Sequence, residues 1–273
     1  MYLWKNTKTL DAFIPELSAT VPPEDAQLAV IGSKPINLSS MPRLQAIFKC
    51  GVGTDNVPFQ EAADRGIRIG LPSENTRNII FEETANFATA FVFRMLYSKV
   101  GDLEDWTKAQ RPFLKNRKVL LLGQGNIGKL VKRKLEPSVE VLTFDAATDP
   151  PGDLEPLVRQ AEVVSLHIPL SDATRGFWNA EKLAWMPDQA ALVNTARGPI
   201  VDERALLAEI ESGRLRAAFD VFWEEPYHGP LRAFHPDRFF MTPHVASTCK
   251  DFLSGLAADF LEFQSQLETN SPA

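Results

Sequence analysis

Lys118–Lys129 reads KVLLLGQGNIGK, and this stretch decides the fold of the second half of the chain. Val119–Leu122 is a short continuous apolar run, as expected of a strand that is buried on both faces. Three glycines with the spacing GxGxxG follow it, namely Gly123, Gly125 and Gly128. Apolar residues then recur at helical intervals, which predicts a helix packed on a sheet: Ile127, Leu130, Val131 and Leu135.

A dinucleotide fits such a turn, because glycine lets its pyrophosphate approach backbone N–H groups at a helix N-terminus. The glycines alone are weak evidence, since similar clusters occur at many turns. A second predicted strand, Val139–Phe144, ends in Asp145, which lies 20 residues beyond Gly125. This carboxylate either ends the strand as a turn residue or binds the adenosine ribose. It would repel a 2′-phosphate, and no Arg or Lys lies between it and Pro151, so NAD is favoured over NADP.

The composition excludes several classes of protein. The 273 residues are 44% hydrophobic, enough to form two domains with buried cores. The net charge of −6 argues against nucleic acid or an anionic membrane as a partner. Cys50 and Cys249 are too few for a disulfide framework and lack metal-ligand spacing, so no metal is expected. No signal peptide or membrane span is recognised, and we expect a cytoplasmic protein.

Apolar runs divide the chain into two α/β units. The first has runs at 28–31, 44–48 and 67–69, followed by an apolar helix over about 79–97 and a hydrophilic linker over 98–116. The second alternates strands with helices, which predicts a parallel sheet covered on both faces, with strands at 119–122, 139–144, 163–166, 191–193, 217–219 and 239–241. A closing helix over 252–267 is expected to pack on the first unit.

Three polar residues after predicted strands are candidates for chemistry. Reduction of a ketone by hydride requires that its carboxylate is anchored, its carbonyl polarised and a proton delivered. Arg197 suits the first two tasks, and His244 the third, with Glu225 holding the imidazole. Taken singly, each has a plainer reading: a solvated arginine, an exposed acidic turn and a structural histidine. Asp220 is either an ordinary strand-end carboxylate or a contact of the nicotinamide carboxamide.

Together these segments resemble the D-isomer-specific 2-hydroxyacid dehydrogenases, the family that includes phosphoglycerate dehydrogenase, along nearly the whole chain. The matching segments are CGVGTDNV, AADRGIRI, PSENTR, GQGNIGK with Asp145, VVSLHIPLSDATRG, MPDQAALVNTARGPIVDERAL, AAFDVFWEEP and TPHVAST. The resemblance implies two Rossmann-like domains: a doubly wound parallel-sheet NAD-binding domain (93–248) and a smaller, discontinuous flavodoxin-like substrate domain (1–92 plus 249–273). It places the active site in the cleft between them.

The resemblance also implies a role for each site residue. Arg197 would bind the substrate, and His244, paired with Glu225, would act as acid and base. The substrate carboxylate would meet Val52 and Gly53, with Asn75 close by. The cofactor would be bordered by Gly123, Gly125, Asn126, Ile127, Gly128, Asp145, Pro169, Thr174, Thr195, Ala196 and Asp220.

We therefore predict an NAD-dependent oxidoreductase that interconverts a 2-oxo acid and a D-2-hydroxy acid, and a homodimer as in the family. An NAD(H)-responsive regulator on the same fold is the alternative, and oxidation of formate is disfavoured because Pro243 stands where the formate enzymes usually carry Gln. Phosphoglycerate-specific members tend to have an arginine just after the strand at 29–31, where this chain reads Ile31-Gly32-Ser33-Lys34. An unspecified 2-oxo acid is therefore preferred to 3-phosphoglycerate.

Overall fold

The computed structural model describes residues 1–269, and these form two compact units. Unit 1 comprises residues 1–80 together with the chain from 247 onward, and unit 2 comprises 81–246. These limits fall twelve and two residues before the predicted domain boundaries of 92/93 and 248/249. The larger difference arises because the helix α2 (Glu74–Leu96) contributes most of its buried side chains to the core of unit 2, from Ala85 to Leu96.

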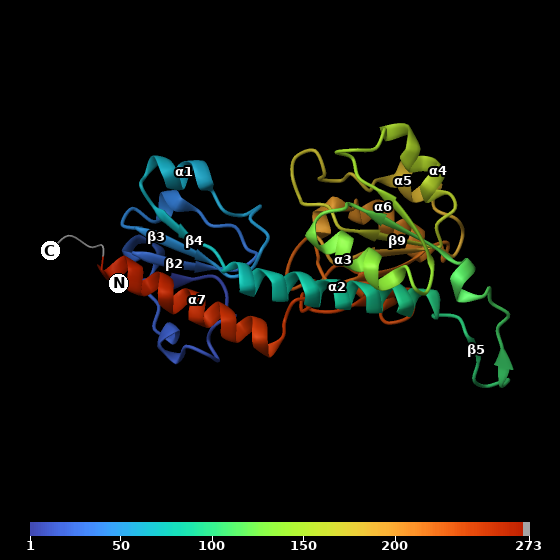
Figure 1. Ribbon diagram of the computed structural model, residues 1–273, viewed down its shortest axis with the longest axis horizontal. Coiled ribbons are helices and arrows are strands. Elements are labelled where there is room, and N and C mark those ends of the chain that lie inside the picture. The colour runs from blue at the N-terminus through green and yellow to red at the C-terminus, as the bar shows by residue number, and fades with distance from the viewer. Residues whose placement is uncertain (270–273) are drawn as a thin grey trace. The chain divides into compact units, whose positions relative to one another are not determined.

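Unit 1 contains a four-stranded parallel sheet in the order β1-β2-β3-β4 (Figure 1). Its strands are β1 (Leu3–Lys5), β2 (Leu28–Ile31), β3 (Ala46–Lys49) and β4 (Arg68–Gly70). Alternate residues of β2 and β3 point to opposite faces and join two separate cores. The long α7 (Lys250–Thr269) covers one face, and the short α1 (Phe59–Asp64) covers the other.

The predicted closing helix is confirmed as α7, and it packs on unit 1 as expected. Phe252, Leu256 and Phe260 of α7 are buried in the core that also holds Leu28 and Phe48. The rings of Phe48 and Phe260 meet edge to face, with centroids 5.2 Å apart. Besides burying apolar area, this contact has a favourable interaction between the ring quadrupoles. It joins α7 to the sheet of unit 1.

Unit 2 contains a six-stranded parallel sheet in the order β12-β11-β10-β9-β7-β8. The predicted strands are confirmed, and their bounds are β7 (Lys118–Leu122), β8 (Glu140–Phe144), β9 (Val163–Leu166), β10 (Ala191–Asn194), β11 (Arg216–Phe219) and β12 (Phe239–Met241). Two buried clusters lie on its opposite faces. One includes α2 and α3 (Asn126–Leu135), and the other α4 (Leu154–Val158), α5 (Ala180–Trp185) and α6 (Glu203–Glu211). The doubly wound prediction is therefore confirmed.

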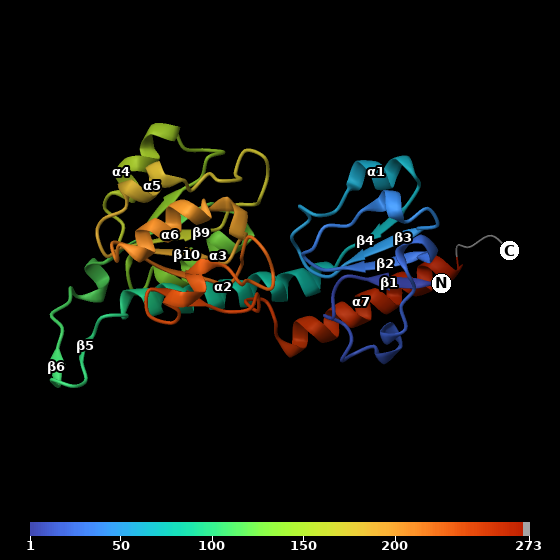
Figure 2. The same cartoon turned by 180° about the vertical axis from the view of Figure 1, so that it is seen from behind.

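Two segments differ from their predicted form. The expected linker at 98–116 lies within unit 2 and projects as a small hairpin of β5 (Gly101–Asp102) and β6 (Thr107–Lys108) (Figure 2). The chain passes from unit 1 to unit 2 within α2 instead. This helix also begins five residues earlier than predicted, because the Ser73 hydroxyl accepts a hydrogen bond from the backbone N–H of Thr76 and caps the first turn.

We predict that Phe260→Ala lowers the free energy of unfolding of unit 1 by about 3–5 kcal/mol, the usual cost of truncating a buried aromatic side chain. Phe260 is fully buried. Leu261→Ala is the matched control, since its side chain is 52% exposed on the same helix and its loss should change stability little. Denaturant unfolding followed by fluorescence and circular dichroism measures both variants. Equal destabilisation by the two substitutions would contradict this assignment of the core.

Candidate active site

The glycine turn after β7 has the shape that a dinucleotide requires. Gly128 lies in the first turn of α3 and is buried, and a Cβ atom built there would lie 2.0 Å from the carbonyl oxygen of Gly123. Gly128 is thus needed for close packing of the turn. A Cβ atom at Gly125 would meet nothing within 4 Å, so the space beside this residue is open. The ten-residue α3 directs its free N-terminal N–H groups toward this turn, where they favour an anion.

Asp145 lies next to the glycine turn, as expected of a ribose-binding carboxylate. Its Oδ2 accepts a hydrogen bond of 2.8 Å from the N–H of Gln124, and its Oδ1 accepts one of 3.0 Å from the N–H of Ala147. The hydrogen bond from Ala147, followed by that from Gln124, holds the pKa of Asp145 below its usual range. The side chain is therefore ionised at neutral pH.

The remaining predicted cofactor residues occupy loops after neighbouring strands. The Thr174 hydroxyl donates to the carbonyl of Pro169 over 2.7 Å, so these two residues belong to one turn after β9. Thr195 and Ala196 follow β10. Thr195 is 8% exposed, and its Oγ1 has no hydrogen-bond partner within residues 1–269. Because buried hydroxyls are rarely left without a partner, Thr195 fits a site where a bound molecule supplies one.

The turn that carries Arg197 is held by Asn194, a residue to which no role was assigned from the sequence pattern. The fully buried Asn194 side chain accepts from the N–H of Ala196 over 2.9 Å and donates to the carbonyl of Arg197 over 2.9 Å. This role could have been inferred from the sequence, because an asparagine at the end of a strand often forms hydrogen bonds to the backbone of the turn that follows. A Cβ atom at Gly198 would lie 2.1 Å from the carbonyl carbon of Phe222, so this glycine allows the turn to approach the loop after β11.

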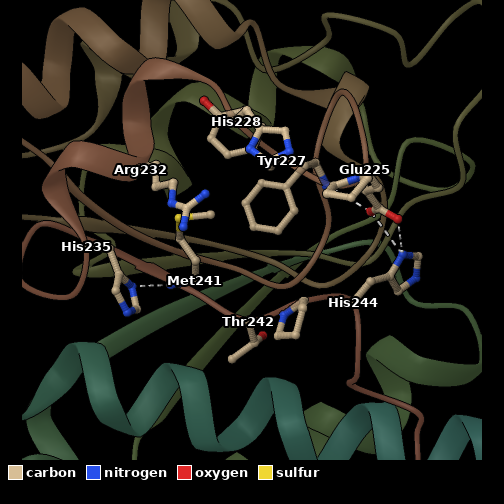
Figure 3. Close-up of a pocket in the computed structure, with 11 residues that line it drawn as sticks. Glu225, Tyr227, His228, Arg232, His235, Met241, Thr242 and His244 are labelled. Atoms are coloured by element: carbon tan, nitrogen blue, oxygen red, sulfur yellow. Dashed lines mark hydrogen bonds and ion pairs between the residues drawn. The ribbon is translucent and has the colours of Figure 1, made fainter.

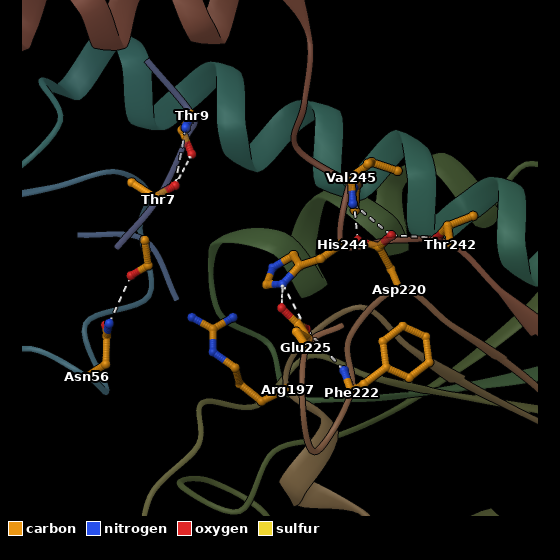
Figure 4. A network of polar contacts seen from close by, with 12 residues as sticks. Thr7, Thr9, Asn56, Arg197, Asp220, Phe222, Glu225, Thr242, His244 and Val245 are labelled. Carbon is orange, nitrogen blue, oxygen red and sulfur yellow. Dashed lines mark hydrogen bonds and ion pairs between the residues drawn. The ribbon is translucent and has the colours of Figure 1, made fainter. Parts of the chain in front are cut away.

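Glu225 lies on that loop and binds His244 (Figure 4). The Nδ1 atom of His244 is 2.8 Å from Oε2 and 3.0 Å from Oε1 of Glu225. Burial raises the pKa of the Glu225 carboxyl, but the hydrogen bond and charge of His244, the N–H of Phe222 and the charge of Arg197 outweigh it, so the pKa is lowered. The carboxylate is thus ionised at neutral pH, and the stability that this bond contributes is lost as the pH falls through that lowered pKa.

Asp220 holds the segment that carries His244. Its carboxylate is fully buried and accepts three hydrogen bonds, from the Thr242 hydroxyl over 2.5 Å, the Val245 N–H over 2.9 Å and the Ala246 N–H over 2.8 Å. His244 itself has a positive φ of 53°, which is uncommon for a residue other than glycine and is imposed by its surroundings. Asp220 therefore positions the histidine, while its predicted contact with nicotinamide stays a prediction.

A pocket of about 550 Å³ adjoins the Glu225–His244 pair within unit 2 (Figure 3). Both residues line one end of it, and Met241 and Arg232 line it further away. Arg197 is not among its lining residues.

Of the predicted site residues, the structure brings Arg197, Glu225 and His244 together in unit 2. Val52, Gly53 and Asn75 belong to unit 1, where Val52 and Gly53 follow β3 and Asn75 lies in the first turn of α2. Their contact with a substrate stays a prediction. No cluster of His, Cys, Asp or Glu suited to a metal ion occurs in residues 1–269. Within the same residues, no helix has the length and apolar character needed to span a bilayer.

Residues 93–246 match the family model described as "D-isomer specific 2-hydroxyacid dehydrogenase, NAD binding domain". The chain belongs to this family. The resemblance inferred from the sequence is thus confirmed, and unit 2 contains the NAD-binding domain of a dehydrogenase that acts on CH–OH groups.

Named relatives support the same family. A hydroxypyruvate reductase of Thermotoga maritima is 32% identical over 237 residues, which cover 80% of this chain and 76% of that protein. A glyoxylate reductase of Thermofilum pendens is also 32% identical, over 85% of this chain and 75% of that protein. The crystal structure of D-lactate dehydrogenase from Aquifex aeolicus, complexed with NAD and lactic acid, is 22% identical and has the same fold, with a TM-score of 0.81 over 98% of this chain and 96% of that one.

We predict that Gly128→Ala and Gly125→Ala have different effects. Gly128→Ala should lower the thermal midpoint of the protein alone, because the added methyl group overlaps the Gly123 carbonyl. Gly125→Ala should leave that midpoint nearly unchanged and weaken NADH binding, because its methyl group enters the open space beside the turn. Thermal unfolding and NADH fluorescence titration measure the two effects. Unchanged NADH affinity in Gly125→Ala would show that the pyrophosphate binds elsewhere.

Proposed function

We propose that the protein reduces a small, unphosphorylated 2-oxo acid to the D-2-hydroxy acid with NADH, or catalyses the reverse reaction. The hydrogen bond between Glu225 and His244, with Arg197 close enough to lower the pKa of Glu225, carries this proposal. The relatives named as hydroxypyruvate and glyoxylate reductases favour short acids. An arginine after β2 that would favour a phosphate is lacking, since the chain there reads Ile31-Gly32-Ser33-Lys34.

NAD(H), when bound, supplies the hydride chemistry, and the side chains supply the rest. Gly123, Gly125, Asn126, Ile127 and Gly128 would hold the pyrophosphate at the start of α3, with Asp145 on the adenosine ribose. Pro169, Thr174, Thr195, Ala196 and Asp220 would border the remainder of the cofactor. These residues have the open turn and the ionised carboxylate that such a molecule requires, and a Thr195 hydroxyl that finds no partner within residues 1–269.

Arg197 would bind the substrate carboxylate and carbonyl through its planar guanidinium. The Glu225 carboxylate would hold the proton on Nδ1 of His244, which leaves Nε2 to exchange a proton with the substrate oxygen. In reduction, Nε2 would deliver its proton to the developing alkoxide of the substrate. In oxidation, Nε2 would accept the proton of the substrate hydroxyl. Val52, Gly53 and Asn75 stay predicted contacts of the substrate.

The direct test is NADH oxidation with a panel of 2-oxo acids, comprising glyoxylate, hydroxypyruvate, pyruvate, phenylpyruvate, 2-oxoglutarate and 3-phosphohydroxypyruvate, with NADPH in parallel. We expect turnover of a short acid and a preference for NADH, because Asp145 is ionised where a 2′-phosphate would lie. Turnover of 3-phosphohydroxypyruvate alone would contradict the proposed substrate class. No turnover of any acid, with NADH still bound, would favour the regulator.

We predict that His244→Gln lowers kcat by about 10²–10⁴-fold, the contribution usual for general acid–base catalysis, while NADH affinity is unchanged. Steady-state kinetics and fluorescence titration measure the two quantities. His228→Gln is the control, because this histidine is exposed, whereas the Glu225 carboxylate is paired with His244. Full activity in His244→Gln would remove the histidine from the mechanism.

We also propose a homodimer, because of an arm formed by residues 100–113. Leu103, Trp106 and Phe113 of this arm are 84%, 81% and 73% exposed. The arm projects from unit 2 as a hairpin (Figure 2). Exposed large apolar side chains on such an arm favour a protein partner, and we propose a second copy of the chain. The two cysteines are free, which suits the proposed cytoplasmic location.

We predict that the double variant Leu103→Ser, Trp106→Ser shifts the protein from dimer to monomer in light scattering, since it removes apolar area from the arm. Leu261→Ser, which also replaces an exposed leucine, should remain a dimer. A dimer that withstands the double substitution would place the interface elsewhere, and a monomeric parent protein would refute the proposal.

A further inference from the structure

A second cavity, of about 340 Å³, lies in unit 2 at the amino-terminal ends of the sheet strands. It is lined by Gln189 before β10, by Arg216 at the start of β11 and by Arg238 before β12. Lys99, shortly after α2, completes the wall. The glycine turn lies at the opposite, carboxyl-terminal ends of these parallel strands, so this cavity is separate from the cofactor site.

The cavity is cationic although the chain as a whole is acidic. Lys99, Arg216 and Arg238 line it, and Asp237 is the one acidic residue among its lining residues. The chain carries a net charge of −6, so such a concentration of positive charge is local and not a consequence of composition. A concave surface lined by one sign of charge raises the local concentration of the opposite ion.

The charge of Arg216 is only partly compensated. Its Nη1 donates to the carbonyl of Met95 over 3.1 Å and its Nη2 to the carbonyl of Gln189 over 2.6 Å, while its buried Nε has no partner in the described part of the chain. Burial, and then the neighbouring charge of Arg117, lower the pKa of Arg216, although Glu162 opposes this effect. A bound anion would relieve this accumulation of positive charge.

Gln189 forms hydrogen bonds with several residues around the cavity while its own backbone is strained. It has a φ of 67°, in the left-handed region that favours glycine. Its side-chain oxygen accepts from Lys99, its side-chain nitrogen donates to the carbonyl of Gly213 over 2.9 Å, and its backbone carbonyl accepts from Arg216. The strained residue thus fixes Lys99 and Arg216 beside the cavity.

Donors remain for a ligand. Within residues 1–269, the Lys99 ammonium group donates one hydrogen bond, to Gln189. Arg238 donates there through Nη1 alone, to the carbonyls of Ile210 and Glu211 at 3.3 Å. We propose that this cavity binds a compact oxyanion, either free phosphate or the phosphate group of a small metabolite, with Lys99 and Arg238 as its ligands. The site does not depend on the proposed catalytic reaction.

This anion site has a defined relation to the catalytic residues. β10, β11 and β12 start at the cavity and lead, at their other ends, to Arg197, Glu225 and His244. An anion bound there would stabilise the folded unit that presents these three side chains, without competing with the substrate or the cofactor.

The test is thermal unfolding with saturating NADH, so that the glycine turn is already occupied. Inorganic phosphate and glycerol 3-phosphate are the probes, and sodium chloride at equal ionic strength is the reference. We expect each effective probe, at about ten times its Kd, to raise the midpoint by about 2–5 °C. The ranking of the two probes distinguishes free phosphate from a phosphate ester, and either ranking supports the site.

Substitutions locate the effect. Lys99→Gln should abolish most of the shift, and because Lys99 is exposed this variant should fold normally. Arg238→Gln is the second variant, and Arg204→Gln, which removes an exposed cation from α6, should retain the shift. A shift that persists in Lys99→Gln and Arg238→Gln, that is lost equally in Arg204→Gln, or that does not exceed the effect of sodium chloride would overturn the proposal.

Discussion

The carboxylate of Asp220 is the constraint on which the candidate active site depends. Burying a charge is costly unless hydrogen bonds compensate it, and here three donors from the segment 242–246 do so. Burial raises the pKa of Asp220, and those donors oppose the rise. The contacts that compensate the buried carboxylate therefore also hold this segment, in which His244 has a left-handed conformation.

Arg197 and Glu225 are also positioned by hydrogen bonds between a side chain and the backbone of a loop. The buried amide of Asn194 replaces missing backbone partners in the Arg197 turn, and the N–H of Phe222 donates to Glu225 over 3.2 Å. Arg197, Glu225 and His244 each follow a strand of a sheet that is buried on both faces, and each lies within six residues of the end of that strand. Rigid placement of this type reduces the reorganisation that a reaction would require.

Much of the fold follows from sequence pattern, because buried parallel strands are continuous apolar runs and α7 has a clear apolar face. The arrangement of Glu225 and His244 was also predictable, since both follow strands of one parallel sheet. The role of Asp220 was not, because two of its three donors are backbone N–H groups, which no residue type reveals. The early start of α2 depended on a single cap at Ser73. The hairpin within 98–116 has two strands of two residues each, which are too short to be recognised from an apolar pattern.

The close approach at Gly198 restricts how substrate preference can diverge in descendants of this chain. Any side chain at that position would overlap the backbone of Phe222 and push the Arg197 turn away from the loop that carries Glu225. Substitution of Gly198 would therefore separate the Arg197 guanidinium from the Glu225 carboxylate. New specificities are therefore expected to arise from loops outside this turn.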